Sequence, residues 1–447
     1  MSSTLFAVAA DTDDRLRATL LAHVDRIRAG RALPPLVRYC HHAATRTAGP
    51  HRVAVAVESY AELAQQLSEI AAGTADRVPA EVTTRRPGLV FVFAGQGAQW
   101  HGMGRELLAT EPVFREALYR CDRQVREFAD FSVVDQLRLD PPASRTDEIQ
   151  VLQPTMVSLQ IALTALWRSW GVTPDAVVGH SMGEIAAAHT AGALSLRDAA
   201  LIACRRSALL RRIVGKGALA TTELSPAQAH AVADASAGRI TVAGENSPRS
   251  TVLAGDADSL AALVEDLSRQ DVYCRVISGT VASHSHYVDE LRVDLHGSLR
   301  SLTPTPTRLP MYSTVTAEPV PGTALGAPYW MRNLREPVRL AAAIGNLSDA
   351  GHEVFVEVSA HPVLLSPVRQ TLERGGRSGW LLSTGRRHAE RRSALSSLGT
   401  LYACGREPNW AALVPRVAEP TITPYQAAVL EAARRPRPVP ARVATSH

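Results

Sequence analysis

The sequence predicts an α/β protein built around a parallel sheet, with a smaller subdomain of different texture inserted into it. Two observations lead to this prediction. Short apolar strands, at residues 89–95, 175–181 and 352–359, alternate with helical segments such as 153–170, an order typical of a parallel sheet flanked by helices. Residues 216–280 break that order with strands that follow one another closely. Strand and helix signals resume afterwards, so we interpret this segment as an insertion.

The first 87 residues form a segment of their own. We predict a helix over 12–29, a loop through ALPP, a strand in HRVAVAVES and a helix in YAELAQQLSEIAAG. The polar, arginine-rich stretch DRVPAEVTTRRPG follows, and stretches of this kind connect domains. We therefore place a boundary near residue 87.

The inserted segment has a recognisable element order. It begins with the strand ALATTEL, after which Ser225 and Pro226 cap and open a helix. The remaining elements are the strands RITVAGEN and STVLAGD, the helix ADSLAALVEDLSRQ and the strand VYCRVIS. The order β-α-β-β-α-β is that of a ferredoxin-like fold.

The composition argues against several classes of protein. No run of about 18 apolar residues is present, so we expect no membrane span. The N-terminus lacks the basic segment of a secretory signal. The five cysteines show no paired spacing, which argues against a disulfide framework and a zinc site and is typical of a cytoplasmic protein. The net charge of +5 comes from dispersed arginines and only 5% of residues are aromatic, so we expect no nucleic-acid partner.

The stretch VVGHSMGEIAAAHTAGAL carries the strongest chemical signal. Its residues Gly179 to Gly183 fit G-x-S-x-G between a predicted strand and a predicted helix, the context of a nucleophile elbow in an α/β-hydrolase-like sheet. Such a turn lifts the hydroxyl of Ser181 clear of the sheet. It also places the N–H of Met182 at a helix N-terminus, where an oxyanion is stabilised. Ser181 is thus a predicted nucleophile, of hydrolysis or of acyl transfer.

The partners of this serine are less clear from the residues alone. The glycine-rich loop FAGQGAQWHGMGREL suits a second oxyanion donor, although a plain strand-to-helix turn explains it equally well. Fifteen histidines are available as a general base, and the residues do not choose among them. The unresolved candidates are His284, His286, His352 and His361.

An arginine stands in an apolar stripe of the helix that follows. Arg206 shares this inward face with four apolar residues, whereas its neighbour Arg205 faces solvent. A guanidinium inside a protein needs an anionic partner. A buried carboxylate such as Glu184 and the carboxylate of a substrate are the alternatives.

Four motifs in order, FAGQGAQWHGMGREL, GHSMGEIAAAHTAGALSLRDAA, VASHS and YWMRNLREPVRL, resemble the acyltransferase domains of modular type I polyketide synthases. Those domains are similar to the malonyl-CoA:acyl carrier protein transacylases of fatty acid synthesis. The resemblance spans essentially the whole chain, and both a free-standing transferase and an excised domain fit it. LGTLYACGREPNWAAL and PTITPYQ resemble the segment that follows such a domain and wraps back.

The resemblance implies a site and a reaction. Ser181 would be the nucleophile, His284 its base, and the N–H groups of Met182 and Gln96 the oxyanion donors. Arg206, 25 residues beyond Ser181, would hold the free carboxylate of the acyl group. An extender unit would pass from CoA to the serine and then to the phosphopantetheine thiol of an acyl carrier protein, with no metal or other cofactor.

Four residues would select the side chain of the extender unit: Val281, Ala282, Ser283 and Met182. In this family a YASH-like motif accompanies methylmalonyl units and HAFH accompanies malonyl. Ser283 in place of phenylalanine leaves room for an α-substituent, and Val281 in place of tyrosine opens more. EIQVLQP resembles the methylmalonyl type, although Met182 stands where that type usually has glutamine. We expect a methylmalonyl or larger alkylmalonyl unit.

The resemblance also implies a division of the chain into segments, and two alternative functions stand beside it. The flanking segments suggest contact with a ketosynthase. The alternatives are a serine hydrolase or thioesterase of the α/β-hydrolase type and a non-catalytic docking module. The predicted divisions are a ketosynthase-to-acyltransferase linker (1–87), a large subdomain (88–215 and 281–385), a small subdomain (216–280), a following linker (386–430) and a disordered tail (431–447).

Overall fold

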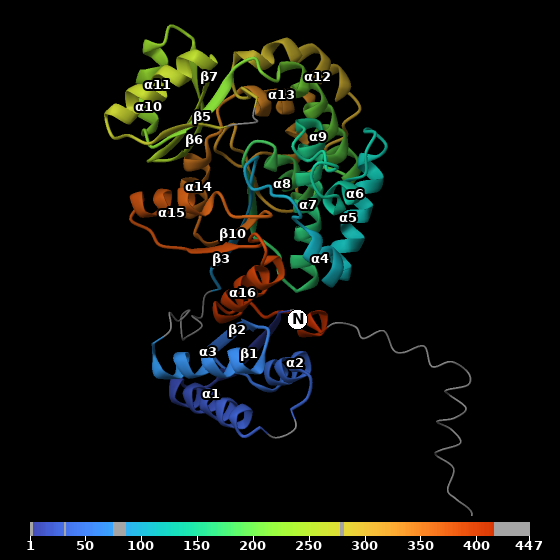
Figure 1. The fold of residues 1–447 in the computed structure, drawn as a ribbon, viewed down its shortest axis with the longest axis vertical. Coiled ribbons are helices and arrows are strands. Elements are labelled where there is room, and N and C mark those ends of the chain that lie inside the picture. Colours follow the sequence, from blue (N-terminus) through green and yellow to red (C-terminus); the bar gives the residue numbers. More distant parts are fainter. Residues whose placement is uncertain (1–2, 31–32, 75–85, 278–280, 415–447) are drawn as a thin grey trace, which may run out of the picture.

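The computed structural model describes residues 3–30, 33–74, 86–277 and 281–414, and its centre is a parallel sheet (Figure 1). The strand order is β11-β10-β3-β4-β9, and all neighbouring strands run parallel. The predicted α/β class is therefore confirmed. The five strands are β3 (Gly88–Phe93), β4 (Ala176–Gly179), β9 (Met311–Tyr312), β10 (His352–Val358) and β11 (Trp380–Ser383).

Helices enclose this sheet, which explains its apolar strands. Leu89 to Phe93 are all fully buried, as expected for a strand covered on both faces. The register places Gly179, Phe93 and Val358 side by side at the carboxyl edge. The surrounding helices are α4 (Arg105–Thr110), α5 (Pro112–Val125), α6 (Val133–Arg138), α7 (Ile149–Ser169), α8 (Gly183–Ala191), α9 (Leu196–Leu210), α12 (Arg292–Ser298), α13 (Ala327–Arg335), α14 (Leu340–Asp349) and α15 (Leu365–Arg374).

Helix α7 begins four residues earlier than the prediction that started it at Gln153. Pro154 lies inside the helix rather than at its start. Among the described residues, α7 alone is long and apolar enough to span a membrane, and 83% of its most apolar stretch is buried within the protein. Packing in the core accounts for that apolar character.

The inserted subdomain has the predicted ferredoxin-like element order. Its antiparallel strands lie in the order β6-β7-β5-β8, and helices α10 and α11 cover them (Figure 1). The Glu245 N–H donates to the Val338 carbonyl at 2.8 Å and joins β6 to the large subdomain. The elements are β5 (Ala218–Thr222), α10 (Pro226–Ala235), β6 (Ile240–Ser247), β7 (Ser250–Gly255), α11 (Ala257–Arg269) and β8 (Cys274–Ile277).

The N-terminal segment contains two elements that the sequence did not reveal. Strand β1 (Thr4–Ala10) pairs antiparallel with β2 (His51–Val57) and is buried along its whole length. A short strand buried on both faces shows no alternation of apolar and polar residues, so its sequence did not mark it as a strand. Helix α2 (Leu36–Arg46) begins directly after Pro35, where the predicted ALPP loop ends, in a stretch for which no element was predicted. The predicted helices are present as α1 (Asp13–Arg28) and α3 (Tyr60–Ala72).

Helix α16 (Glu390–Ala403) lies against this N-terminal segment, as Figure 1 shows. The Tyr402 ring packs with Ala7, Ala9 and Ala44, and the Arg52 guanidinium lies 4.7 Å above it. Arg52 also pairs with Glu407 at 3.1 Å. A short helix, α17 (Trp410–Leu413), follows. The PTITPYQ motif and the predicted tail lie outside the described residues.

Candidate active site

Ser181 occupies a sharp turn between β4 and α8. Its φ of 53° lies in the left-handed region, a strained conformation for a residue with a side chain. A Cβ on Gly179 would come within 2.3 Å of the Glu184 nitrogen, and one on Gly183 within 2.3 Å of the Phe93 oxygen. Both glycines are therefore required for this close approach, as a nucleophile elbow demands.

The structure brings His284 to this serine. Its Nε2 lies 2.8 Å from the Ser181 Oγ, and its Nδ1 lies 2.8 Å from the Glu336 carbonyl oxygen. A carbonyl can only accept a hydrogen bond, so Nδ1 carries the proton and Nε2 is free to receive the proton of the hydroxyl. The other three candidate histidines do not contact Ser181 in the described part of the chain. A backbone carbonyl thus orients this imidazole, the task that an aspartate performs in a serine triad.

Burial, and then the nearby charge of Arg206, lowers the pKa of His284 to about 3. The Glu336 carbonyl opposes this shift. The imidazole is therefore neutral at pH 7 and able to accept a proton.

This pKa predicts an unusual pH profile for serine acylation. Above its pKa the imidazole is neutral and active, and below it the protonated ring cannot act as a base. The value of kcat/KM for acyl loading should stay level from pH 7 to pH 5, because the acid limb follows the pKa of the free enzyme. With an imidazole pKa near 6.5, kcat/KM would fall about 25-fold over that range. Stopped-flow release of CoA at each pH measures the profile, and a loss of that size would contradict the prediction.

Arg206 lies beside the dyad, buried to 2% exposure. Its Nη2 donates to the Ser181 Oγ at 3.0 Å and its Nη1 donates to Asn333 Oδ1, while its Nε has no hydrogen-bond partner among the described residues. Burial lowers its pKa to about 10, which leaves it charged at pH 7. A buried cation with an unpaired donor beside a candidate nucleophile is suited to hold an anion.

Glu184 does not pair directly with this arginine. Its carboxylate accepts from the Thr314 N–H and hydroxyl, from the Tyr329 hydroxyl at 2.6 Å and from Asn333 Nδ2 at 2.8 Å. Burial raises the pKa of Glu184, and these four donors lower it. The direct Glu184–Arg206 pair, one alternative from the sequence, is therefore wrong, because an amide separates the two charges.

The predicted oxyanion donors both lie next to the elbow. Met182 precedes the first residue of α8, and neither its N–H nor that of Gln96 donates to an acceptor in the described residues. The Gln96 loop packs closely on the turn, since a Cβ on Gly95 would come within 2.9 Å of the His180 oxygen and 3.6 Å of the Ser181 Cβ. Two backbone amides without an acceptor among the described residues thus adjoin the elbow, and their role as oxyanion donors stays a prediction.

The predicted selectivity residues directly precede His284. Val281 and Ala282 are buried and Ser283 is half-buried. The His284 N–H donates to the Leu334 carbonyl at 2.9 Å, which anchors this segment on α13. The side chain of Met182 is buried beneath the elbow.

Two contacts at the site escaped the sequence. Asn333 bridges Arg206 and Glu184, and His180 Nε2 lies 2.9 Å from Asn246 Oδ1 on β6. The second contact ties the elbow to the small subdomain. A lone asparagine in a helix or a strand carries no pattern, so neither partner could be found from the sequence.

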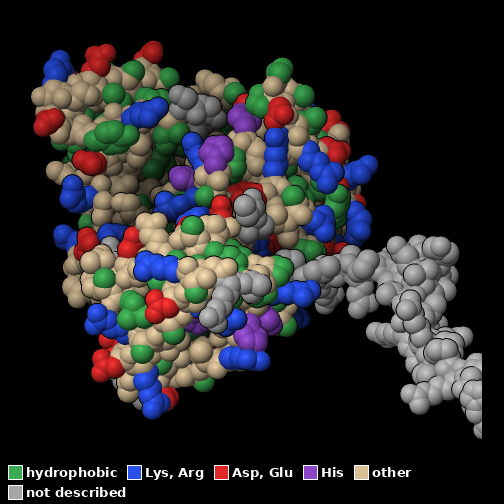
Figure 2. Space-filling view, turned by 60° about the horizontal axis from the view of Figure 1, so that its bottom comes forward, with side chains coloured by type: hydrophobic (Ala, Val, Ile, Leu, Met, Phe, Trp, Pro, Cys, Tyr) green, Lys and Arg blue, Asp and Glu red, His purple; other side chains and the backbone are tan. Residues whose placement is uncertain are grey.

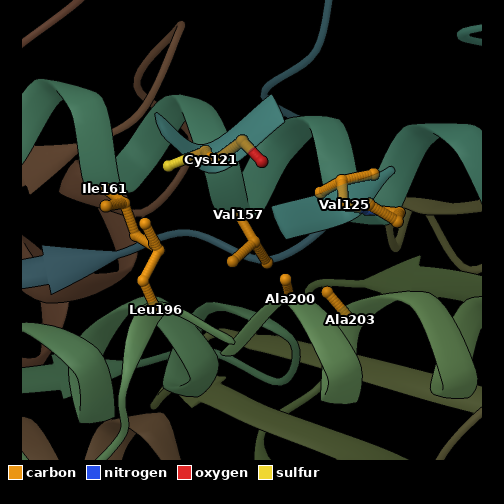
Figure 3. Close-up of a pocket in the computed structure, with 9 residues that line it drawn as sticks. Cys121, Val125, Val157, Ile161, Leu196, Ala200 and Ala203 are labelled. Atoms are coloured by element: carbon orange, nitrogen blue, oxygen red, sulfur yellow. The ribbon is translucent and has the colours of Figure 1, made fainter. Parts of the chain in front are cut away.

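The surface is hollowed beside the small subdomain, with histidine and basic side chains on the border of the hollow (Figure 2). A second cavity differs in character. It has a volume of about 10 Å³ and lies between α5, α7 and α9. Figure 3 shows side chains that line it, among them Val157, Ile161 and Ala203. Cys121 also lines it, but burial raises the pKa of this thiol to about 12, so the sulfur stays protonated and the cavity belongs to the core that supports α9.

Known proteins share this arrangement. The profile of the acyl transferase domain family matches residues 90–406. Erythronolide synthase EryA2 of Saccharopolyspora erythraea is 39% identical over 389 residues, which is 86% of this chain and 11% of that protein. Polyketide synthase GfsB of Streptomyces halstedii is 42% identical over 385 residues, 85% of this chain and 7% of that protein. The chain thus spans about a tenth of the length of these relatives.

Solved structures agree over nearly the whole chain. The acyltransferase domain from module 8 of the salinomycin polyketide synthase is 34% identical, with a TM-score of 0.84 over 92% of this chain and 98% of that one. The acyltransferase domain of SpnD, in complex with 2-(pent-4-yn-1-yl)malonyl, is 26% identical, with a TM-score of 0.80 over the same shares. The likeness includes the N-terminal segment as well as both subdomains. Together with its serine and histidine at the elbow, these matches show that the chain is an acyltransferase and belongs to the acyl transferase domain family of polyketide synthases.

Proposed function

We propose that this acyltransferase loads an α-substituted malonyl unit from CoA onto Ser181 and passes it to the phosphopantetheine thiol of an acyl carrier protein. The observation that carries the proposal is Arg206, a buried cation 3.0 Å from the Ser181 Oγ with no carboxylate paired to it among the described residues. An acyl group that brings its own carboxylate completes this arrangement.

The first half-reaction forms an ester. The Ser181 Oγ attacks the thioester carbonyl while His284 Nε2 takes its proton, and the N–H groups of Met182 and Gln96 receive the oxyanion. The carbon–sulfur bond then breaks, and CoA leaves with the proton from His284. In the second half-reaction the carrier thiol gives its proton to His284 and attacks the ester. The carbon–oxygen bond breaks, and Ser181 regains its proton.

Arg206 would act on the substrate and on the nucleophile together. In the structure its Nη2 donates to the Ser181 Oγ and thus occupies a lone pair of the attacking atom. A carboxylate bound to the guanidinium takes over that donor and leaves the lone pair free. An acetyl group has no carboxylate, so it leaves the buried guanidinium unpaired and leaves Nη2 bound to the Ser181 Oγ. Both effects disfavour acetyl-CoA as a donor.

The selectivity segment supports an α-substituted unit. Ser283 is small and adjoins His284, which leaves room near the acyl ester. The SpnD domain, similar in fold, is known in complex with a malonyl that bears a five-carbon substituent. By analogy with that complex, we assign methylmalonyl or a larger alkylmalonyl to this chain.

Filling this space should reverse the preference. Ser283→Phe is expected to lower the methylmalonyl-to-malonyl ratio of kcat/KM by roughly 10-fold or more, because steric differences of one methylene are worth about 1–3 kcal/mol. Ser283→Ala, which keeps the space, serves as the control and should retain the ratio. An unchanged ratio in Ser283→Phe would remove this residue from selection.

One experiment tests the proposed donor. The protein is mixed with equal amounts of acetyl-, malonyl-, methylmalonyl- and ethylmalonyl-CoA, and intact-mass spectrometry identifies the adduct on the protein. We expect methylmalonyl or ethylmalonyl to dominate. A malonyl-only adduct would overturn the α-substituted preference, and an acetyl adduct would overturn the role of Arg206.

The remaining assignments are part of the same proposal. The reaction uses no metal or redox cofactor, since CoA arrives with the donor and phosphopantetheine with the carrier. We place the protein in the cytoplasm, which suits five free cysteines that are all buried. The N-terminal segment and α16 together form the surface that would meet a ketosynthase.

A further inference from the structure

Asn333 connects all the charged parts of the site. It lies on α13 and is buried to 2% exposure. Its Oδ1 accepts from Arg206 Nη1, and its Nδ2 donates to Glu184 Oε2 at 2.8 Å and lies 3.2 Å from the Ser181 carbonyl oxygen. One neutral amide therefore stands between a buried cation and a buried anion.

This placement decides which edge of the guanidinium is available. Nη1 is engaged by Asn333, Nη2 reaches the hydroxyl of Ser181, and Nε is unpaired among the described residues. The edge formed by Nε and Nη2 is thus the one left for a two-point contact with a carboxylate. Glu184, whose two oxygens already accept from Thr314, Tyr329 and Asn333, does not compete for it.

We propose that Asn333 is a positioning residue that keeps Arg206 from pairing with Glu184 and presents its Nε–Nη2 edge to the carboxylate of the acyl group. The inference rests on the proposed role of Arg206 and deepens it. It makes Asn333 a determinant of the preference for carboxyacyl over simple acyl donors, although it touches neither the thioester nor the attacking oxygen.

Only an amide satisfies both neighbours. Its oxygen accepts from the arginine while its nitrogen donates to the glutamate. An aspartate would offer Arg206 a carboxylate from within the protein and would repel Glu184. An alanine would leave Nη1 without an acceptor and one Glu184 oxygen with one donor fewer, and hydrogen bonds to charged groups of this kind are the stronger ones.

The test compares donor preference in two variants, Asn333→Asp and Asn333→Ala. The measured quantity is the ratio of kcat/KM for methylmalonyl-CoA to that for acetyl-CoA. We expect the ratio to fall roughly 100-fold in Asn333→Asp, whose new carboxylate competes for the guanidinium, and roughly 10-fold in Asn333→Ala. The loss should arise mainly from methylmalonyl-CoA. A merely structural role would lower both donors alike and leave the ratio unchanged.

Asn346 provides a matched control. It lies on α14, and its Nδ2 likewise donates to a carbonyl, of Ala317, and to a carboxylate, of Glu318, away from the dyad. Asn346→Asp makes the same chemical change and should keep the wild-type ratio. Circular dichroism and the thermal midpoint confirm folding, and Asn333→Ser replaces any variant that does not fold.

The outcomes separate the two proposals. If Arg206→Ala lowers the ratio while folded Asn333 variants keep it, the role of Asn333 is overturned and the proposed function stands. If Arg206→Ala itself leaves the ratio unchanged, the carboxylate role of the arginine fails. If the donor ratio falls both in Arg206→Ala and in the Asn333 variants, while Asn346→Asp keeps the wild-type ratio, the inference is supported.

Discussion

Ser181→Ala is expected to abolish covalent loading and to lower acyl transfer to the carrier protein by roughly 10⁴-fold or more, the scale seen when a nucleophile of this type is removed. The reason is direct, since the Ser181 Oγ lies 2.8 Å from the only imidazole that contacts it in the described residues. Intact-mass spectrometry after incubation with methylmalonyl-CoA measures the loading, and transfer to a purified carrier protein measures the rate.

Ser195→Ala is the control for this variant. Ser195 caps α9 through a hydrogen bond from the Asp198 N–H at 3.0 Å and takes no part in the dyad. Its loss should cost about 1 kcal/mol of folding stability and leave loading intact. Loading of Ser181→Ala at the native rate would disprove the proposed mechanism.

Arg206→Ala should alter which donors are accepted. Truncating one member of a buried ion pair costs about 2–5 kcal/mol, so kcat/KM for methylmalonyl-CoA should fall by roughly 30-fold to 4,000-fold. Acetyl-CoA, which has no carboxylate, should be affected far less or even gain. The pKa of His284 should also rise, because the charge of Arg206 helps to lower it. The acid limb of acyl loading would then move to higher pH.

Arg205 gives a neighbouring comparison on the same helix. It is exposed and lies over the Phe128 ring at 5.8 Å. Arg205→Ala removes the same charge one residue earlier on the exposed face of α9 and should retain both the donor preference and the pH profile. If Arg206→Ala and the wild type have the same ratio of kcat/KM for methylmalonyl-CoA to that for acetyl-CoA, the proposed carboxylate contact is excluded.

Much of this architecture could be predicted from the sequence, because it depends on local patterns. Short stretches of sequence predict each strand and helix, and their succession gives the α/β alternation and the β-α-β-β-α-β order of the insertion. The elbow is local too, since Gly179 and Gly183 must approach neighbouring backbone. Strand β1 was missed because its full burial removes the alternation of apolar and polar residues, and helix α2 was missed because no capping side chain marks its start.

The contacts between the residues of the site could not be predicted in the same way. Ser181 and His284 are 103 residues apart, and only the resemblance to a family chose this histidine over three others. The role of Asn333 depends on the packing of α13 against the elbow, and the spacing of residues in the sequence does not predict that packing. The residues alone could not decide between Glu184 and a substrate carboxylate as the partner of Arg206 for the same reason, because Glu184 is reached through the Asn333 amide.

The contact between α16 and the N-terminal strands bears on how this catalyst can be moved between assemblies. A unit cut at the limits of the family match, residues 90 and 406, would retain α16 but lose β1 and β2, leaving Tyr402 stripped of Ala7, Ala9 and the Arg52 guanidinium. Domain swaps should therefore transplant both flanks together, with the first cut placed ahead of β1.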